Sequence, residues 1–206
     1  KTTDVQLDFL FNNGAYGQAG ALEDLPTLAL REQFESNVFG WHYLTSKVIK
    51  IMRSQGYGRI VMNSSVLGFV CMPYRGAYNA SKYAIEALTD TFRLELADTN
   101  IKICLLEPGP INSDFRKNAA LKFKQYINWN DSVHSENYKI QLERLEKEVT
   151  TNKFTLEPEA VTKCLIHALE SQRPKIRYRI TFPTKLFSLL KRIMSAGLLD
   201  RLLVKG

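Results

Sequence analysis

Short apolar runs that alternate with long helical stretches constrain the fold of this chain more than any other feature of its sequence. Runs typical of buried strands lie at residues 7–12, 59–63, 101–106 and 176–182. Each of the first three ends in a polar or glycine-containing turn. Strands that alternate with helices are typical of βαβ units, whose strands run parallel. The sequence therefore predicts an α/β fold around a mostly parallel sheet.

Helical stretches are expected between and after these strands. Residues 26–54 carry apolar side chains at helical spacing, and residues 77–98 predict a second helix. Residues 158–171 begin with a proline, which suits the first turn of a helix. Residues 183–203 predict a basic amphipathic helix, with a break at Gly197 as the alternative to one continuous helix.

Composition places the chain among ordinary globular proteins. Of its 206 residues, 45% are hydrophobic and 24% are charged, which suits one domain and excludes a collagen-like or disordered chain. The three cysteines contain no C-x-x-C pair, so we expect reduced thiols in a cytoplasmic protein and no zinc site. The three histidines are scattered, and no metal site is expected. No apolar run reaches the roughly 18 residues of a membrane-spanning helix.

The net charge of +7 is concentrated near the end of the chain. Residues 173–206 hold nine Lys and Arg side chains but only one acidic residue, Asp200. A basic helix with interleaved Leu and Phe is typical of a segment that contacts a membrane surface. It is equally typical of a solvated rim, or of a helix that packs at a dimer interface or over a substrate, so these alternatives stay open for residues 184–203. Nucleic-acid binding is not expected, because no recognition motif accompanies the charge.

Polar and glycine-containing turns directly follow three of the predicted strands. The turns are Asn12-Asn13-Gly14, Ser64-Ser65 and Pro108-Gly109. The carboxyl ends of parallel strands meet at one edge of a sheet, and ligands of such folds bind in the crevice beyond that edge. We therefore expect the three turns to face one crevice, although each taken alone is also ordinary turn chemistry.

Tyr78 and Lys82 are the strongest candidates for acid–base chemistry. They are four residues apart, so one helix face carries both. A phenol has a pKa near 10, and a neighbouring ammonium lowers that pKa by stabilising the phenolate. The pair can therefore protonate a carbonyl oxygen as the carbonyl is reduced. Tyr43 and Lys47 share the spacing, but only Tyr78 has a serine, Ser65, thirteen residues upstream at the end of a predicted strand.

Five motifs resemble those of the short-chain dehydrogenases/reductases, in the order and at the spacings of that family. They are NNGA (12–15), Asn37 in NVFG, NSSVLG (63–68), YNASK (78–82) and EPGPI (107–111). The resemblance covers about residues 5–182 and looks closest to bacterial reductases related to the retinol and hydroxysteroid dehydrogenases. It implies a Rossmann-like, doubly wound parallel sheet in one dinucleotide-binding domain, residues 1–183, followed by the basic helix at 184–206.

The resemblance implies catalytic roles for four residues. Tyr78 would be the general acid/base, and Lys82 would lower the pKa of Tyr78 and bond the nicotinamide ribose. Ser65 would hydrogen-bond the substrate oxygen, where charge develops during hydride transfer. Asn37 would hold a water that joins Lys82 to solvent in a proton relay.

The resemblance also implies a nicotinamide cofactor, NADP rather than NAD because the chain is most similar to reductases. The cofactor-binding candidates besides Tyr78 and Lys82 are Asn12, Asn13 and Gly14 on the adenosine side, and Pro108, Gly109, Ile111 and Ser113 beside the nicotinamide carboxamide. A serine stands at the last of these positions, where the family often has threonine.

Two departures from the family pattern bear on cofactor binding. The chain reads Asn-Asn-Gly-Ala where the family usually has Asn-Asn-Ala-Gly. The glycine-rich TGxxxGxG turn, expected roughly 70 residues before Asn12, does not occur in the sequence. We therefore expect the natural protein to begin about 65–80 residues upstream with further strands, and the given chain alone to bind cofactor poorly.

Residues 111–155 are expected to form an irregular lid over the substrate. Aromatic side chains in this segment favour an apolar aldehyde or ketone, or the matching alcohol, and packing of the lid onto the body is the alternative role for them. A homodimer or homotetramer is expected through the helices that carry Asn37 and Tyr78. Two other functions stay open: a non-catalytic relative that acts as a cofactor sensor or scaffold, and an epimerase or dehydratase on the same fold.

Overall fold

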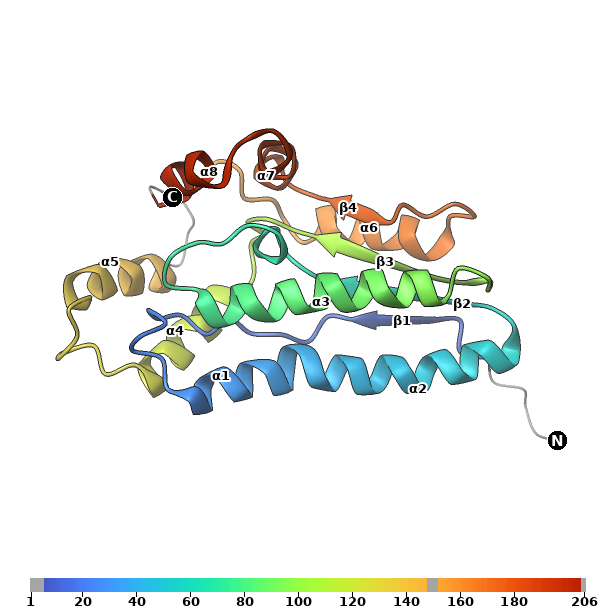
Figure 1. Ribbon diagram of the computed structural model, residues 1–206, viewed down its shortest axis with the longest axis horizontal. Helices are drawn as coiled ribbons and strands as arrows, with labels where there is room; N and C mark the ends of the chain where they lie inside the picture. Colours follow the sequence, from blue (N-terminus) through green and yellow to red (C-terminus); the bar gives the residue numbers. More distant parts are fainter. Residues whose placement is uncertain (1–5, 148–151, 205–206) are drawn as a thin grey trace.

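A four-stranded parallel sheet organises the fold, as Figure 1 shows. The structure is a computed structural model that describes residues 6–147 and 152–204. Strands pair in sequence order, every pair parallel: β1 (Phe9–Asn12), β2 (Gly58–Asn63), β3 (Ile101–Glu107) and β4 (Arg177–Arg179). The predicted α/β fold with a parallel sheet is thus confirmed.

Helices connect the strands and follow the last of them. Up to β3 they are α1 (Thr27–Phe34), the π-helical turn η1 (Glu35–Phe39), α2 (Gly40–Gln55), the 3₁₀ turn η2 (Val66–Gly68) and α3 (Gly76–Glu95). After β3 they are α4 (Phe115–Tyr126), α5 (Ser135–Glu146), α6 (Glu159–Glu170), α7 (Phe182–Ile193) and α8 (Ala196–Leu203).

Both faces of the sheet are buried, which makes the fold doubly wound as predicted. Successive side chains of a strand point to opposite faces. One face carries Ile60, Met62, Ile103 and Leu105 in a core with α2 and α3, and the other carries Val61, Cys104 and Leu106 in a core with α6. In Figure 1, α3 lies in front of the sheet and α6 lies behind it.

The prediction that residues 111–155 are irregular is wrong, because α4 and α5 lie within them. Tyr138, Leu142 and Leu145 are buried at helical spacing and pack in one cluster with Phe123 of α4. Each helix is short, and charged residues stand between the apolar ones, so the segment showed no clear period in the sequence. Burial against a neighbouring helix stabilises what local pattern alone does not predict.

The last helix breaks at Met194 and Ser195, not at Gly197 as the sequence analysis offered. Met194 and Ser195 both have extended backbone, whereas Gly197 lies in the first turn of α8. The break turns α8 so that Leu199 and Leu203 are buried. Within the part of the chain that the structure describes, no helix combines the length and apolar character needed to cross a bilayer.

Candidate active site

The carboxyl ends of β1 and β2 bring two of the predicted turns together. The side-chain amide of Asn63 donates to Oδ1 of Asn13 at 2.6 Å. Asn12 points inward instead, since its buried amide donates to Oγ1 of Thr45 at 2.9 Å. Of the adenosine-side candidates, Asn13 and Gly14 are therefore exposed at the crevice, and Asn12 fixes the end of β1 against α2.

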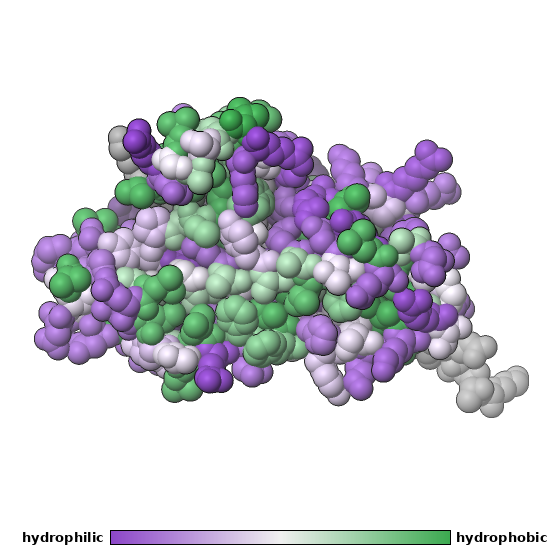
Figure 2. All heavy atoms as spheres, in the orientation of Figure 1, coloured by the Kyte–Doolittle hydropathy of each residue, from purple (hydrophilic) through white to green (hydrophobic). Residues whose placement is uncertain are grey.

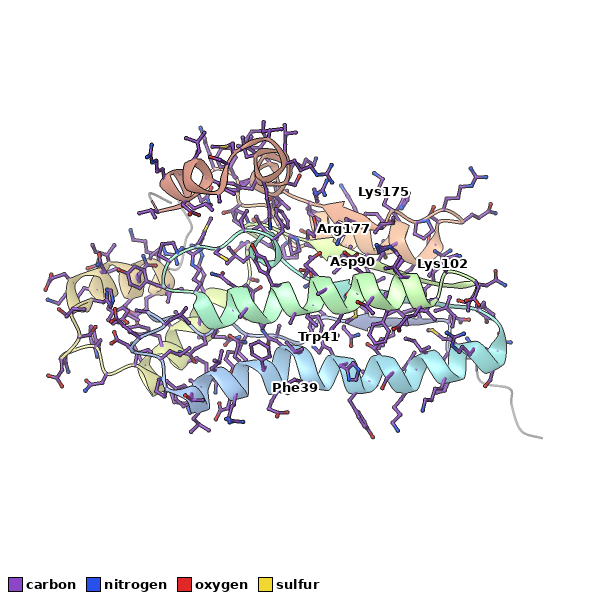
Figure 3. All side chains as sticks on the ribbon, viewed as in Figure 1. Phe39, Trp41, Asp90, Lys102, Lys175 and Arg177 are labelled. Atoms are coloured by element: carbon purple, nitrogen blue, oxygen red, sulfur yellow. The ribbon has the colours of Figure 1, made fainter. Side chains whose placement is uncertain are left out.

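Helix α3 places Tyr78 and Lys82 on its buried face. The ammonium of Lys82 donates to the backbone carbonyl of Asn63 at 2.6 Å. It lies 5.6 Å from the centre of the Tyr78 ring and 4.6 Å from that of Trp41, within the range of a cation–π interaction. Figure 3 shows Trp41 on α2, on the side of that helix that faces α3. Lys82 is thus held between the end of β2 and two aromatic rings.

Ser65 joins this group from the turn after β2. Its extended backbone begins η2, and its hydroxyl accepts the N–H of Leu67 at 3.1 Å. The Ser65 side chain also lies beside the phenol of Tyr78, where it acts to lower the pKa of that phenol. The next residue, Val66, donates its N–H to the carbonyl of Pro108 at 2.8 Å, which ties the serine turn to the Pro-Gly turn. The structure therefore brings Ser65, Tyr78 and Lys82 together at the carboxyl end of β2.

Burial perturbs both titratable groups of the site. It raises the pKa of Tyr78 to about 12, while the hydrogen bond to Ser65 and the positive charge of Arg75 act in the opposite direction. Burial lowers the pKa of Lys82 to about 7, while the negative charge of Glu86 acts to raise it. Because the pKa of Lys82 lies near neutrality, its charge changes within the physiological range. Neighbouring groups with strongly shifted pKa values are typical of functional sites.

Asn37 lies in the π-helical turn η1 and is fully buried. Its amide donates to the carbonyl of Tyr16 at 3.0 Å and to Oγ of Ser81 at 3.2 Å, and its Oδ1 accepts the N–H of Tyr16 at 3.3 Å. The side chain thus clamps the loop after β1 to α3. A π-helical turn shifts backbone carbonyls out of the α-helical pattern, and such turns are frequent at functional sites.

The residues of the segment from Pro108 to Ser113 have two different surroundings. A Cβ on Gly109 would lie 2.1 Å from Oγ1 of Thr181, so only glycine fits there. Ile111 forms an isolated bridge with Leu156, and Ser113 is exposed. Ile111 and Ser113 line a cavity of about 540 Å³ together with residues of α4 and the end of α5. These two carboxamide candidates therefore face the lid cavity.

Two aromatic residues of the site were missing from the sequence prediction. Phe115 of α4 covers Tyr78, with ring centres 5.1 Å apart. Trp41 contacts the Lys82 ammonium and stands four residues after Asn37, on the same helix face. The four-residue spacing between Asn37 and Trp41 is a sequence signal from which Trp41 could have been predicted. Phe115 has no such signal, because no local sequence pattern relates it to Tyr78.

The crevice fits the ribose and nicotinamide end of a dinucleotide. Among the described residues, Oδ1 of Asn63 is buried without a hydrogen-bond partner. A Cβ placed on Gly14 meets no described heavy atom within 4 Å, so this turn leaves open space. The Lys82 ammonium donates to the backbone carbonyl of the same Asn63, and hydroxyl groups suit such a donor and acceptor pair. The described residues include no group of three His, Cys, Asp or Glu side chains that could hold a metal ion.

Comparison with known proteins gives consistent matches. The family model described as short chain dehydrogenase matches residues 3–123. "Uncharacterized oxidoreductase YbbO" of Escherichia coli is 39% identical over 201 residues, which cover 98% of this chain and 68% of that protein. An NADPH-dependent 3-dehydrocapnine reductase of Ornithobacterium rhinotracheale is 30% identical, with 97% and 70% covered. Human retinol dehydrogenase 8 is 29% identical, with 93% and 62% covered.

A solved structure shares the fold. A short-chain dehydrogenase/reductase from Burkholderia phymatum, in complex with NAD, aligns with a TM-score of 0.71 and 25% sequence identity. The alignment covers 89% of this chain and 64% of that one. The chain thus spans about two thirds of the length of the proteins it matches.

Proposed function

The chain belongs to the short-chain dehydrogenase family, and from this premise we propose that it is an NADP(H)-dependent oxidoreductase that reduces an apolar aldehyde or ketone, or oxidises the matching alcohol. The observation that carries the proposal is the contact of Ser65 with Tyr78 above the Lys82 ammonium. These residues come from the turn after β2 and from one face of α3. A proton donor, a hydrogen-bond donor and a positive charge thus converge on one point.

Each member of the group has a distinct part in the proposed reaction. Ser65 donates a hydrogen bond to the substrate carbonyl oxygen and orients it. Tyr78 donates its proton to the same oxygen, so that an alcohol is formed and a phenolate remains. When Lys82 carries its proton, its positive charge stabilises that phenolate. Burial raises the pKa of Tyr78, and Ser65 and Arg75 act to lower it. A bound nicotinamide cofactor supplies or accepts the hydride.

The proton returns to Tyr78 through Lys82 in this proposal. The Asn37 side chain bonds Tyr16 and Ser81, which fixes the position of Asn37 beside α3. In this proposal Asn37 holds a water that joins Lys82 to solvent. The contact of Lys82 with the Asn63 carbonyl gives the ammonium a fixed position at the inner end of such a path.

The preference for NADP rests on the relatives. One relative is named as NADPH-dependent, at 30% identity across most of the chain. The Burkholderia phymatum structure was solved with NAD, at 25% identity. The greater identity of the NADPH-dependent protein favours NADP. A ratio of kcat/KM for NADPH over NADH well above one is the expected result.

An apolar substrate is proposed from the surroundings of Tyr78. Its ring lies in a cluster with Val66 and Leu67 of η2, to which Phe115, Leu199 and Leu203 also belong. Such walls exclude water and favour apolar groups over charged ones. The polar atoms of Ser65 and Tyr78 then fix one oxygen of an otherwise apolar ligand.

A homodimer or homotetramer in the cytoplasm completes the proposal. Figure 2 shows apolar side chains gathered on the face over α2 and α3. Phe39, Tyr43 and Leu94 on or beside these helices are at least half exposed. Exposed apolar patches of this kind mark contacts between protein copies. The three free cysteines agree with a reducing compartment.

The test follows the absorbance of reduced nicotinamide with the full natural chain. NADPH and NADH are offered with aldehydes of increasing length and with ring ketones. We expect turnover that rises with apolar length and that Tyr78→Phe lowers by at least about 100-fold. Tyr43→Phe is the matched control, because Tyr43 and Lys47 share the spacing on an exposed face. It should keep full activity.

Other outcomes assign other functions. Tight NADPH binding without turnover that depends on Tyr78, on a widened panel as well, would support a cofactor sensor or scaffold. Product formed without net consumption of cofactor would support an epimerase or dehydratase. Equal losses in Tyr78→Phe and Tyr43→Phe would remove the assignment of Tyr78 as the proton donor.

A further inference from the structure

An apolar stripe runs along the outer face of α7. Phe182, Leu186, Leu189 and Ile193 are 58%, 38%, 56% and 69% exposed. They recur at helical spacing, so they form one continuous row. A neighbouring face of α7 is used in the fold, where its Phe187 and Leu190 pack against the cluster around Tyr78. The stripe is therefore additional to the packing of the helix.

Positive charge borders this stripe. Lys185 and Arg192 are seven residues apart, so they lie along one side of the row. Lys191 lies on the other side of the helix, where its ammonium donates to the carbonyl of Phe69. Helix α7 contains no Asp or Glu, and residues 173–206 contain only Asp200. Figure 2 shows apolar and polar side chains side by side over α7 and α8 at the top of the molecule.

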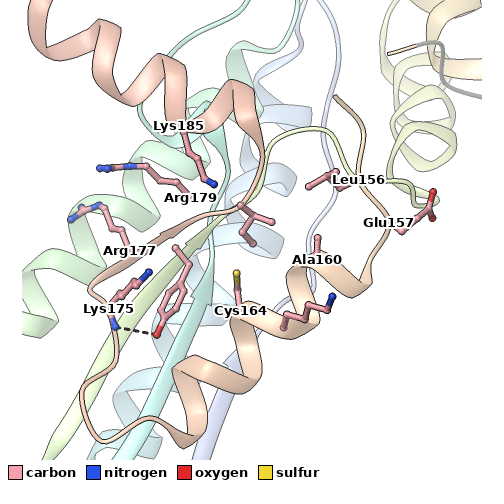
Figure 4. Close-up of a pocket in the computed structure, with 11 residues that line it drawn as sticks. Leu156, Glu157, Ala160, Cys164, Lys175, Arg177, Arg179 and Lys185 are labelled. Carbon is pink, nitrogen blue, oxygen red and sulfur yellow. Dashed lines mark hydrogen bonds between the residues drawn. The ribbon is translucent and has the colours of Figure 1, made fainter. Parts of the chain in front are cut away.

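A basic cavity of about 650 Å³ lies beside the start of α7, between β4 and α6 (Figure 4). Two of the cations that line the cavity, Arg177 and Arg179, each form an ion pair with Glu107. Among the described residues, no carboxylate lies within ion-pair distance of Lys163, Lys175 or Lys185, whose ammoniums also line the cavity. Lys185 belongs to both the cavity and the border of the stripe. The two positive regions thus meet at Lys185, and the carboxylate of Glu157, which also lines the cavity, accepts from the amide of Asn112.

From these observations we propose that α7 and the adjoining cavity form a docking surface for an anionic lipid bilayer. The stripe enters the boundary between headgroups and acyl chains, and the lysines contact lipid phosphates. An amphipathic helix with aromatic and leucine side chains on one face and Lys or Arg at its edge binds membranes in this way. Juxtaposed basic residues add to the affinity for an anionic surface.

A second copy of this chain fits the surface less well. In a two-fold dimer the same patch meets itself, so it must be self-complementary. The stripe on α7 is bordered by Lys185 and Arg192, and α7 has no Asp or Glu, so two copies that met through this helix would bring like charges together. An anionic lipid surface removes this repulsion and covers the same apolar row.

Docking would place the candidate active site near the bilayer. The inner face of α7 packs in the cluster that contains Tyr78, so the helix lies between that site and the lipid. An apolar ligand then has a short path from the membrane. The lipid contact itself does not depend on the proposed reaction, and its test needs no substrate.

The test is co-sedimentation of the full natural chain with vesicles. Vesicles of phosphatidylcholine with 30% phosphatidylglycerol, at about 0.1 M salt, should bind the protein, and phosphatidylcholine alone should bind at least about fivefold less. Leu189→Ser with Ile193→Ser should abolish binding to the anionic vesicles. Lys185→Gln with Arg192→Gln should weaken it and reduce its dependence on salt. Leu121→Ser with Ile140→Ser is the matched control, because these residues are both 61% exposed on α4 and α5.

Several results would overturn the proposal. Absence of sedimentation with the anionic vesicles, or equal loss in the control variant, would end it. Analytical ultracentrifugation of the same variants measures their oligomeric state and so tests the competing occupant, a second copy of this chain. A dimer that Leu189→Ser with Ile193→Ser converts to monomer, without any vesicle binding, would assign the stripe to contact between copies. Circular dichroism of each variant shows that the loss does not come from unfolding.

Discussion

At the scale of the residue, Lys82 shows how burial and function are joined. Its ammonium is fully buried between the Asn63 carbonyl and two aromatic rings, and this burial lowers its pKa to about 7. The pairing of Tyr78 with Lys82 and its link to Ser65 were predictable, because spacing along one helix and a serine at a strand end are local signals. The contact of Lys82 with Trp41 was predictable in principle from the spacing of Trp41 after Asn37. The contact of Tyr78 with Phe115 was not predictable, because Phe115 belongs to a helix distant in the chain.

The first prediction concerns the stability of the folded chain. In the unfolded chain Lys82 titrates at about 10.5, so between pH 7 and that value the unfolded state binds more protons. The free energy of unfolding should therefore rise with pH in this window, by up to about 1.4 kcal/mol per pH unit. Lys82→Met should remove this contribution. Urea unfolding of both proteins at pH 7, 8 and 9 measures it, and identical pH slopes would contradict it.

The second prediction concerns Glu86, which stands one turn after Lys82 and acts to raise its pKa. Glu86 is itself buried, and burial together with Glu107 raises its pKa to about 7. Glu86→Gln should lower the pKa of Lys82, so the alkaline limb of the kcat/KM profile should move to lower pH. Asp90→Asn is the control, because Asp90 shares the ion pair with Arg177 but lies one turn further away. An unmoved limb in Glu86→Gln would refute this role.

At the scale of the element, the strands and the long helices could be predicted from the sequence, but the junctions between them could not. Residues 176–182 were predicted as a strand, but β4 is shorter because Thr181 caps α7 by accepting the N–H of Thr184. The π-helical turn around Asn37 has no sequence period of its own, so it interrupts a helix that was predicted to be continuous. Junctions of this kind depend on contacts between elements distant in the chain.

The third prediction tests the junction between β3 and α7. Gly109→Ala would place a methyl group 2.1 Å and 2.8 Å from the hydroxyls of Thr181 and Thr184. Overpacking of this kind should lower the free energy of unfolding by about 1–3 kcal/mol. Gly14→Ala is the matched control, since a Cβ there meets open space. Chemical denaturation measures both, and equal stability of the two variants would show that the junction relaxes without cost.

At the scale of the whole molecule, the parallel sheet was predictable from the alternation of strand-like and helical runs, and its doubly wound form was implied by the family resemblance. What the sequence could not show is how α4, α7 and α8 close over Tyr78, because each carries apolar residues on more than one face. Phe187 and Leu190 of α7 turned inward, while Leu186 and Leu189 remained exposed. Only the packed structure separates these two rows.

The fourth prediction concerns assembly through the face over α2 and α3. Tyr43→Ser with Leu94→Ser should shift the proposed dimer or tetramer towards monomer, because both side chains are well exposed there. Analytical ultracentrifugation of the full natural chain measures the change. Leu121→Ser, on α4, is the control and should leave the assembly intact. An assembly unaffected by the double substitution would place the interface elsewhere.

The central claim is that Ser65, Tyr78 and Lys82 form a centre for hydride transfer between a nicotinamide and a carbonyl carbon. Mass spectrometry of the alcohol formed with NADPH deuterated at the transferring position tests it most directly, with Tyr78→Phe as the companion variant. We expect one deuterium on the former carbonyl carbon of each product molecule, and almost no product with Tyr78→Phe. Product without deuterium, or labelled product at the same rate from both proteins, would contradict it.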